Sequence, residues 1–336
     1  MQLGEEDRAD HEADRQIFQE ALAQFGEVDV QHHDHEQKQH RDRADIDHDH
    51  SEIKRIEMTT HTVLQAEMVD GLERASQADR VKQYSLGKIL LVWAAAAAPM
   101  GVLGWIVAPA LSRGSDNPGM VRLGVLTIGL IWQFVLVMIL LYREAGNLHW
   151  STIRERLWIQ APRSSRTGGM DRRLWWWLVP VIVLTVLYEM QVIGVMDRLW
   201  VSLFPALAEP PGFSLGGILS SPGAKAQMVG AWGFFWLFIV NALFNTVIGE
   251  ELLFRGLLLP RMAGAFGKWD WVVNGLLFGF YHWHQPWVFI GAAIEGAFLF
   301  AFPTKRFRTA WFGIIAHCGQ TVFFAFLLLG LVLGLA

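Results

Sequence analysis

Long apolar runs separated by short basic segments divide the sequence after residue 88. Each run is close to the ~20 residues that an α-helix needs to cross a hydrocarbon core. Hydrophobic residues make up 52% of the chain, which contains 16 Trp and 22 Phe and is too apolar for an ordinary soluble domain. The pattern predicts an all-α, polytopic membrane helix bundle of about seven transmembrane helices. The expected spans are residues 89–111, 123–142, 174–195, 229–259, 271–286, 288–303 and 309–335.

Residues 1–80 differ in composition from the rest of the chain. They contain nine Lys or Arg against 21 Asp or Glu, whereas the remainder contains 19 basic and 11 acidic residues. Because "VQHHDHEQKQHRDRADIDHDH" has almost no apolar residues to offset chain entropy, we expect a disordered, acidic, His-rich tail. Two alternatives are a site for zinc or another divalent ion, and a start codon placed too far upstream of Met58. The clustered histidines are His32, His33, His35, His40, His48 and His50.

The distribution of Lys and Arg predicts the orientation in the membrane. Basic residues are concentrated in residues 143–173, 261–268 and 305–308, which are alternate loops of the predicted bundle. We therefore expect a multi-pass protein of the cell membrane with a cytoplasmic N-terminus. Topology accounts for these basic loops, and nothing in their sequence indicates lipid or nucleic-acid binding.

Three regions follow from this pattern. Residues 1–80 are the tail, residues 81–170 hold the first membrane helices with the basic loop, and residues 171–336 form a C-terminal core. An amphipathic piece at the membrane interface is expected near residues 199–207. With Cys318 as the single cysteine, no intrachain disulfide can form.

Three charges lie inside the fourth apolar run, in "FNTVIGEELLFRGLLLPRM". Ionisable groups at membrane depth are costly and usually functional. Glu251 and Arg255 are four residues apart and can pair on one helix face. Glu250 points about 100° away from Glu251, which leaves it free to face another group.

Two later runs contain histidines. Asn274, Phe278 and His282 follow one another at i+4 steps, and His317 shares its helix face with Gln320 and Thr321. In a continuous helix His284 lies about 200° from His282, so we expect it to be an interfacial residue. Glu250, His282 and His317 each lie about 13–18 Å from the basic end of their helices. This common depth predicts that they form one site, with functional atoms about 4–6 Å apart.

These motifs, Glu250-Glu251-x-x-x-Arg255, Phe278-x-x-x-His282 and His317, resemble the CPBP family of intramembrane proteases, the CAAX-prenyl protease and bacteriocin-processing (Abi) group. The resemblance covers about residues 170–336 and implies an intramembrane endopeptidase, glutamic or metal-dependent, that acts on a membrane-associated peptide or protein. It further implies that Glu250 and His282 activate the attacking water, and that His317 stabilises the oxyanion or binds a metal.

The chemistry of the residues is compatible with two schemes. Amide hydrolysis needs a general base and donors aimed at the developing oxyanion. Alternatively, Glu250, His282 and His317 are a plausible three-ligand set for Zn²⁺ with a fourth position open for water. Cys318 is a poor candidate nucleophile, because its helical neighbour His317 points about 100° away.

Other classes of function remain open alternatives. A non-catalytic membrane immunity or scaffold protein of the same fold is one, because Thr321 stands where the family commonly has Asn. A transporter is another, since intramembrane carboxylates and histidines also build proton relays, although no internal repeat supports it. Gln320 offers two N–H donors where Thr321 offers one, so we expect Gln320 to supply the donor that Asn supplies in the family. The alternative is that Gln320 forms a hydrogen bond between helices and His317 stabilises the oxyanion alone.

Deleting residues 1–57 is expected to leave membrane insertion and activity unchanged, because this segment has too few apolar residues to pack against the bundle. Complementation by the truncated chain is the measurement. Loss of insertion or activity would show that the tail has a role, and zinc dependence of that role would support the metal alternative.

Overall fold

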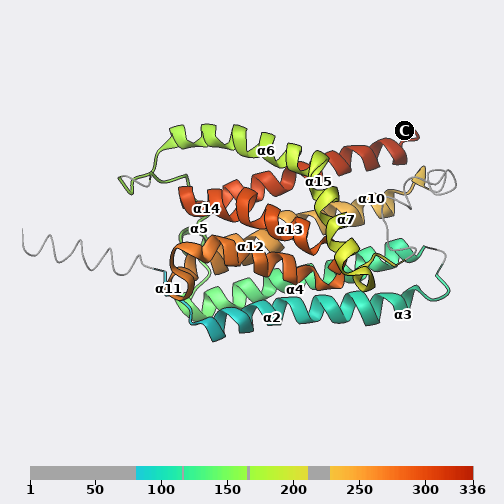
Figure 1. Cartoon of the computed structure of the whole chain (residues 1–336), viewed down its shortest axis with the longest axis horizontal. Coiled ribbons are helices and arrows are strands. Elements are labelled where there is room, and N and C mark those ends of the chain that lie inside the picture. Colours follow the sequence, from blue (N-terminus) through green and yellow to red (C-terminus); the bar gives the residue numbers. More distant parts are fainter. Residues whose placement is uncertain (1–80, 116, 165–166, 211–227, 336) are drawn as a thin grey trace, which may run out of the picture. The chain divides into compact units, whose positions relative to one another are not determined.

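The computed structural model describes residues 81–115, 117–164, 167–210 and 228–335. Within these ranges the chain is helical with no strand, which confirms the all-α prediction (Figure 1). The expected tail, its histidines and Met58 lie outside the described residues. The α-helices are α2 (Leu86–Val102), α3 (Ala108–Ser112), α4 (Pro118–Ala145), α5 (Trp150–Arg156), α6 (Leu178–Gln191), α7 (Ile193–Leu203), α10 (Trp232–Ala242), α11 (Ala263–Phe266), α12 (Asp270–Tyr281), α13 (Phe289–Glu295), α14 (Phe302–Phe307) and α15 (Trp311–Val332).

Shorter π-helical and 3-10 segments join or extend these helices. The π-helical segments are η1 (Leu103–Val107), η4 (Leu243–Gly249), η5 (Leu252–Leu258) and η10 (Gly296–Ala301). The 3-10 segments are η2 (Arg172–Trp177), η3 (Pro205–Leu207), η6 (Leu259–Arg261), η7 (Gly267–Trp269), η8 (His282–His284) and η9 (Pro286–Val288).

Six helical stretches among the described residues are long and apolar enough to cross a membrane. They are Leu86–Ser112, Pro118–Ala145, Arg172–Gln191, Trp232–Arg261, Pro286–Phe307 and Trp311–Val332. The remaining run expected to span, residues 271–286, is the 12-residue helix α12 followed by one 3-10 turn. At 1.5 Å per residue, α12 is about 18 Å long, well short of a hydrocarbon core. It therefore ends at depth inside the bundle.

The end of α12 is covered by indole groups from other helices. Trp93 of α2 donates to the Leu277 carbonyl at 2.8 Å, and Trp105 of η1 donates to the Trp283 carbonyl at 3.0 Å. Trp200 of α7 donates to the Pro286 carbonyl at 2.8 Å. Carbonyls freed where a helix stops need such partners when water is excluded. The Trp283 and Pro286 carbonyls, in the segment that follows α12, are thereby satisfied by protein groups.

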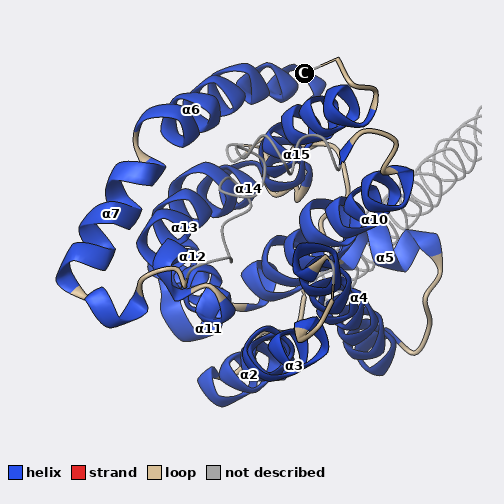
Figure 2. Cartoon of the chain, turned by 90° about the vertical axis from the view of Figure 1, so that its right-hand side faces the viewer, coloured by secondary structure: helices blue, strands red, loops and turns tan. Residues whose placement is uncertain are grey.

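Helices α6 and α7 lie along the outside of the bundle (Figure 2). Helix α6 packs on α15, and α7 packs on α13. The amphipathic piece expected near residues 199–207 starts earlier, at Ile193, and is fixed to α13 because Asp197 accepts a hydrogen bond from the Gly291 amide at 3.2 Å. Helix α7 is thus docked on the bundle over most of its length.

One buried network ties the basic end of the bundle together. Glu144, near the C-terminus of α4, accepts from Arg261 Nε at 3.0 Å and Nη2 at 2.8 Å, and it also bonds Tyr84 and Lys88. Arg261 is completely buried. Burial raises the pKa of Tyr84, so its hydroxyl stays protonated and donates to the Glu144 carboxylate. Helices α2, α4 and η6 are fixed to one another by this carboxylate.

The basic loops gather at this same end of the bundle. The Arg163 amide donates to the Phe307 carbonyl at 2.8 Å, which joins the loop after α5 to the turn after α14. Lys305 bonds the Lys268 carbonyl at 3.2 Å, and Gln83 bonds the Pro260 carbonyl at 2.9 Å. The basic loops that we expected on one side of the membrane therefore lie at one end of the bundle. Which side of the membrane this is stays a prediction.

Glu144→Gln is expected to lower the free energy of unfolding by about 3–5 kcal/mol, because it leaves the buried Arg261 guanidinium without a counter-charge. Lys88→Gln removes a partly exposed partner of the same carboxylate and should cost under about 1 kcal/mol. Thermal unfolding in detergent is the measurement, and equal losses from the two variants would contradict the assignment.

Candidate active site

Glu250 and Glu251 are both buried, and their side chains face different partners. Glu250 accepts from the Asn245 amide, with its nitrogen turned to the carboxylate, at 2.8 Å to Oε1 and 3.2 Å to Oε2. It also accepts from the hydroxyl of Tyr281, which in turn accepts from Gln133 of α4. Each of these donors is neutral. No ion pair to Glu250 is present in the described chain.

The π-helical segment η4 explains how Asn245 reaches Glu250. A π-helix closes its hydrogen bonds between residues five apart, so its wider turn brings positions i and i+5 onto one face. Asn245 and Glu250 have this spacing, and Asn245 lies within η4. In an α-helix the two side chains would diverge by about 140°. The sequence pattern alone therefore gave no signal for this contact.

Glu251 forms the ion pair that its spacing from Arg255 predicts. Arg255 Nη1 donates to Glu251 Oε1 at 2.8 Å, and both side chains are fully buried. Arg255 Nη2 donates to the Gly296 carbonyl at 3.0 Å, and the guanidinium lies 4.2 Å from the Phe278 ring centroid. These contacts compensate a charge that would otherwise be costly to bury.

Two glycines allow this close approach. A Cβ at Gly313 of α15 would lie 2.5 Å from Glu251 Oε2. A Cβ at Gly296 would lie 2.9 Å from Arg255 Nη2. At either position a Cβ would force the end of the Glu251 or the Arg255 side chain to shift, so glycine lets α15 and η10 pack directly on the ion pair as it stands.

His317 is held by the same carboxylate. Its Nδ1 lies 3.1 Å from Glu251 Oε1, and its ring stacks on Phe300 with centroids 4.9 Å apart. A carboxylate beside Nδ1 favours the tautomer with the proton on Nδ1, which leaves Nε2 as the nitrogen able to face a substrate. The structure therefore assigns His317 a fixed orientation through Glu251.

His282 lies at the point where α12 ends. Its Nδ1 is 2.9 Å from the Phe278 carbonyl, which can only accept, so Nδ1 carries the proton and Nε2 is free to act as an acceptor. Its ring contacts the Phe278 ring with centroids 4.8 Å apart, and His317 contacts the same ring at 6.0 Å. Phe278 thus brings the two histidines into one region.

The expectation for His284 is wrong. The side chain is buried and its ring stacks on that of His282, with centroids 5.8 Å apart. The α-helix ends at Tyr281, and His282–His284 form a 3-10 turn, so the angle calculated for a continuous α-helix does not apply. His284 Nδ1 has no hydrogen-bond partner in the described chain.

The structure does not gather Glu250, His282 and His317 into a metal-binding set. No group of three or more His, Cys, Asp or Glu side chains among the described residues is disposed to hold one ion. Glu250 bonds Asn245 and Tyr281, whereas His317 bonds Glu251. Glu251 faces α15 through His317. The expected distances of about 4–6 Å among Glu250, His282 and His317 stay a prediction. The side chains as placed do not fit a shared Zn²⁺.

Gln320 and Thr321 are half-buried on α15, one turn beyond His317. Neither side chain makes a hydrogen bond within the part of the chain that the structure describes. The Gln320 amide therefore has free donors, and its assignment to the oxyanion stays a prediction. Cys318 instead faces Thr246, with Sγ 3.4 Å from Oγ1.

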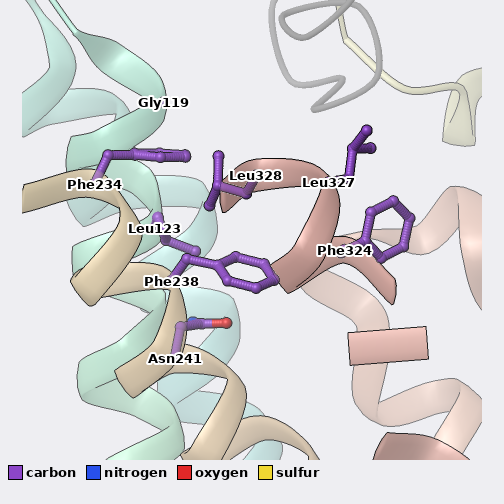
Figure 3. Close-up of a pocket in the computed structure, with 8 residues that line it drawn as sticks. All are labelled: Gly119, Leu123, Phe234, Phe238, Asn241, Phe324, Leu327 and Leu328. Carbon is purple, nitrogen blue, oxygen red and sulfur yellow. The ribbon is translucent and has the colours of Figure 1, made fainter. Parts of the chain in front are cut away.

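An apolar pocket of ≈ 150 Å³ lies among α4, α10 and α15 (Figure 3). Asn241 is the polar residue at its edge and lies four residues before Asn245. Phe234 and Phe238 face Phe324 and Leu328 across it. The pocket has room for a small apolar group and contains none of the candidate catalytic residues.

The six candidate residues lie within residues 231–323, which match a protein-family model and extend from α10 into α15. This match confirms the resemblance of this part of the chain to the CPBP family of intramembrane proteases. The matching model is that of the Type II CAAX prenyl endopeptidase Rce1-like proteins. Comparisons with curated proteins and with solved structures give no significant match.

Glu251→Gln is expected to reduce the free energy of unfolding by about 3–5 kcal/mol, because the buried Arg255 guanidinium loses its counter-charge. Glu250→Gln is the matched control, since its carbonyl oxygen can still accept from Asn245 and Tyr281. Yield and thermal unfolding of the two variants in detergent should separate them. Equal destabilisation would contradict the different roles assigned to the two carboxylates.

Proposed function

We propose that the chain is an intramembrane endopeptidase in which Glu250 takes a proton from the water that attacks the peptide carbonyl. The observation that supports this role is the difference between the two carboxylates. Glu251 is neutralised by Arg255, whereas Glu250 is held only by the neutral donors Asn245 and Tyr281. A carboxylate without a cationic partner is the better proton acceptor.

The proposed reaction uses groups already on the site. The water oxygen bonds to the carbonyl carbon while its proton passes to Glu250, and the carbonyl oxygen becomes an oxyanion. His317, oriented by Glu251, donates from Nε2 to this oxygen when the ring is protonated, and the Gln320 amide is the second donor. Protonated Glu250 then gives its proton to the leaving amine as the C–N bond breaks.

His282 is proposed to position the same water. With Nδ1–H committed to the Phe278 carbonyl, Nε2 is an acceptor that can orient one hydrogen of the water while Glu250 takes the other. This division of roles agrees with those that the family resemblance implies for Glu250 and His282.

The proposed substrate is a membrane-associated peptide or protein, because the site lies within helices of membrane-spanning length. The description of the matching family makes a prenylated C-terminal peptide the first substrate to test. A peptide of the same sequence without the prenyl group is the comparison that measures what the lipid contributes. We place the protein in the cell membrane, with its N-terminus in the cytoplasm.

A non-catalytic immunity or scaffold function is the second candidate. It is favoured by Thr321, which stands where the family commonly has Asn. A wild-type protein that folds and binds peptides of the tested library, but cleaves none of them, would support this function over the protease.

Glu250→Gln is expected to abolish cleavage of a peptide library while leaving folded protein, because the amide keeps the shape of the carboxylate and loses the base. Mass spectrometry of the products, with purified protein in detergent, is the measurement. Unimpaired cleavage would falsify the assignment. A parallel incubation with a chelator tests the metal alternative, since loss of wild-type activity there would show that an ion is required.

Gln320→Ala is expected to lower turnover by about a hundredfold to a thousandfold, the usual effect of removing an oxyanion donor. Thr321→Val should cost much less, because it removes only one hydroxyl and keeps the side-chain volume. Steady-state kinetics on one cleavable peptide compares the two. If Gln320→Ala turns over normally and Thr321→Val does not, Thr321 is the donor and the assignment to Gln320 is wrong.

A further inference from the structure

A second pocket lies at the basic end of the bundle, away from the candidate active site. It is open, measures ≈ 680 Å³, and is formed by α5, the segment after it, and the residues that lead into η2. Three arginines and one glutamate line it: Arg154, Arg163, Arg172 and Glu155. The lining therefore carries a net positive charge. Figure 1 shows α5, α14 and the start of the α6 segment at the same end of the bundle.

The wall of this pocket is held in place by the backbone. Gln160 offers its carbonyl to the Thr309 hydroxyl at 2.7 Å, and the Arg163 amide donates to Phe307 at 2.8 Å. An antiparallel bridge then joins Arg163 to Met170. The pocket is consequently part of the packed bundle and is built on the α14–α15 turn.

The arginines that line this pocket have side-chain N–H donors without a partner among the described residues. Arg154 and Arg172 make no hydrogen bond or ion pair with their side chains among the described residues. Arg163 Nη2 donates to Gln160 at 3.3 Å, but its Nε is buried without a partner. Buried N–H groups are normally satisfied, so an unpaired one beside an open pocket indicates a missing acceptor. Planar guanidinium groups bind phosphate oxygens with two donors at once.

The level of the pocket relative to the membrane indicates which molecule supplies that acceptor. Arg172 begins η2, and Trp175, Trp176 and Trp177 follow it before the apolar helix α6. Trp176 is 78% exposed and Trp177 is 55% exposed. Exposed tryptophans at the end of a membrane-spanning stretch lie at the level of the lipid headgroups. The arginine pocket therefore opens where phospholipid phosphates are.

We propose that this pocket binds the phosphate-bearing headgroup of an anionic phospholipid. Arg154, Arg163 and Arg172 supply the donors, and the volume exceeds what a free phosphate ion needs. Basic pockets at helix ends on the cytoplasmic side of membrane proteins are suited to anionic headgroups. Glu155 disfavours binding of a bare polyanion without removing the net positive charge. The proposal is independent of peptide cleavage.

The test uses the delipidated full-length protein in a neutral detergent, with phosphatidylglycerol or phosphatidylcholine of the same acyl chains. Native mass spectrometry measures the bound fraction of each lipid. Wild type should prefer phosphatidylglycerol. The double variant Arg154→Gln/Arg172→Gln should lose about fivefold in affinity per arginine, or about 25-fold in all. Both positions are exposed, so folding should be retained; adding Arg163→Gln should weaken binding further.

The matched control is Arg143→Gln/Arg173→Gln, which removes two exposed arginines from the same end but not from the pocket. It should bind phosphatidylglycerol as wild type does. Equal loss in both double variants would show a diffuse surface charge effect and overturn the proposal. Displacement of the lipid by inorganic phosphate as readily as by a soluble glycerophosphate headgroup would make this a free-phosphate site and overturn the lipid assignment.

Discussion

The Glu251–Arg255 ion pair is the interaction on which the rest of the C-terminal bundle depends. Two charges without access to water are tolerable only if contacts within the protein replace much of their lost hydration. Arg255 reaches the Gly296 carbonyl and the Phe278 ring, and Glu251 reaches His317. Three elements that are distant in the sequence, α12, η10 and α15, are thereby brought against the helix that carries the pair. The same carboxylate that stabilises the fold orients a candidate catalytic histidine.

The local spacings that a regular helix produces could be read from the sequence. The apolar runs predicted the six stretches of spanning length, together with a seventh that is the short helix α12. The four-residue spacing predicted the contact between Glu251 and Arg255. What the sequence could not show is where the helix departs from 3.6 residues per turn. The π-helical turn that brings Asn245 to Glu250 leaves no trace in the hydropathy, because a π-helix and an α-helix of the same residues are equally apolar.

Contacts made across helices were hidden for a different reason. Tyr281 and Gln133 bond in a chain that ends on Glu250, yet neither is near it in sequence. Tyr281 directly precedes His282, so a polar ring next to the predicted histidine was the one signal available. His284 was misjudged because Pro286 marks the break only approximately, and the α-helix already ends at Tyr281. The distances counted from the helix ends predicted which helices form the site. They could not predict which carboxylate faces which imidazole.

The indole groups that cover the end of α12 bear on how such a site is hydrated. The free carbonyls of a helix that ends inside the hydrocarbon core would ordinarily be hydrogen-bonded by water. That water could also take part in side reactions. Here Trp105 and Trp200 donate to the Trp283 and Pro286 carbonyls just beyond the end of α12. With these carbonyls occupied, polar side chains are the groups left to bind water at this depth. In the proposed hydrolytic site, this arrangement would limit the amount of water that reaches the peptide bond. The interruption of the helix would then not open a hydrated path through the bilayer.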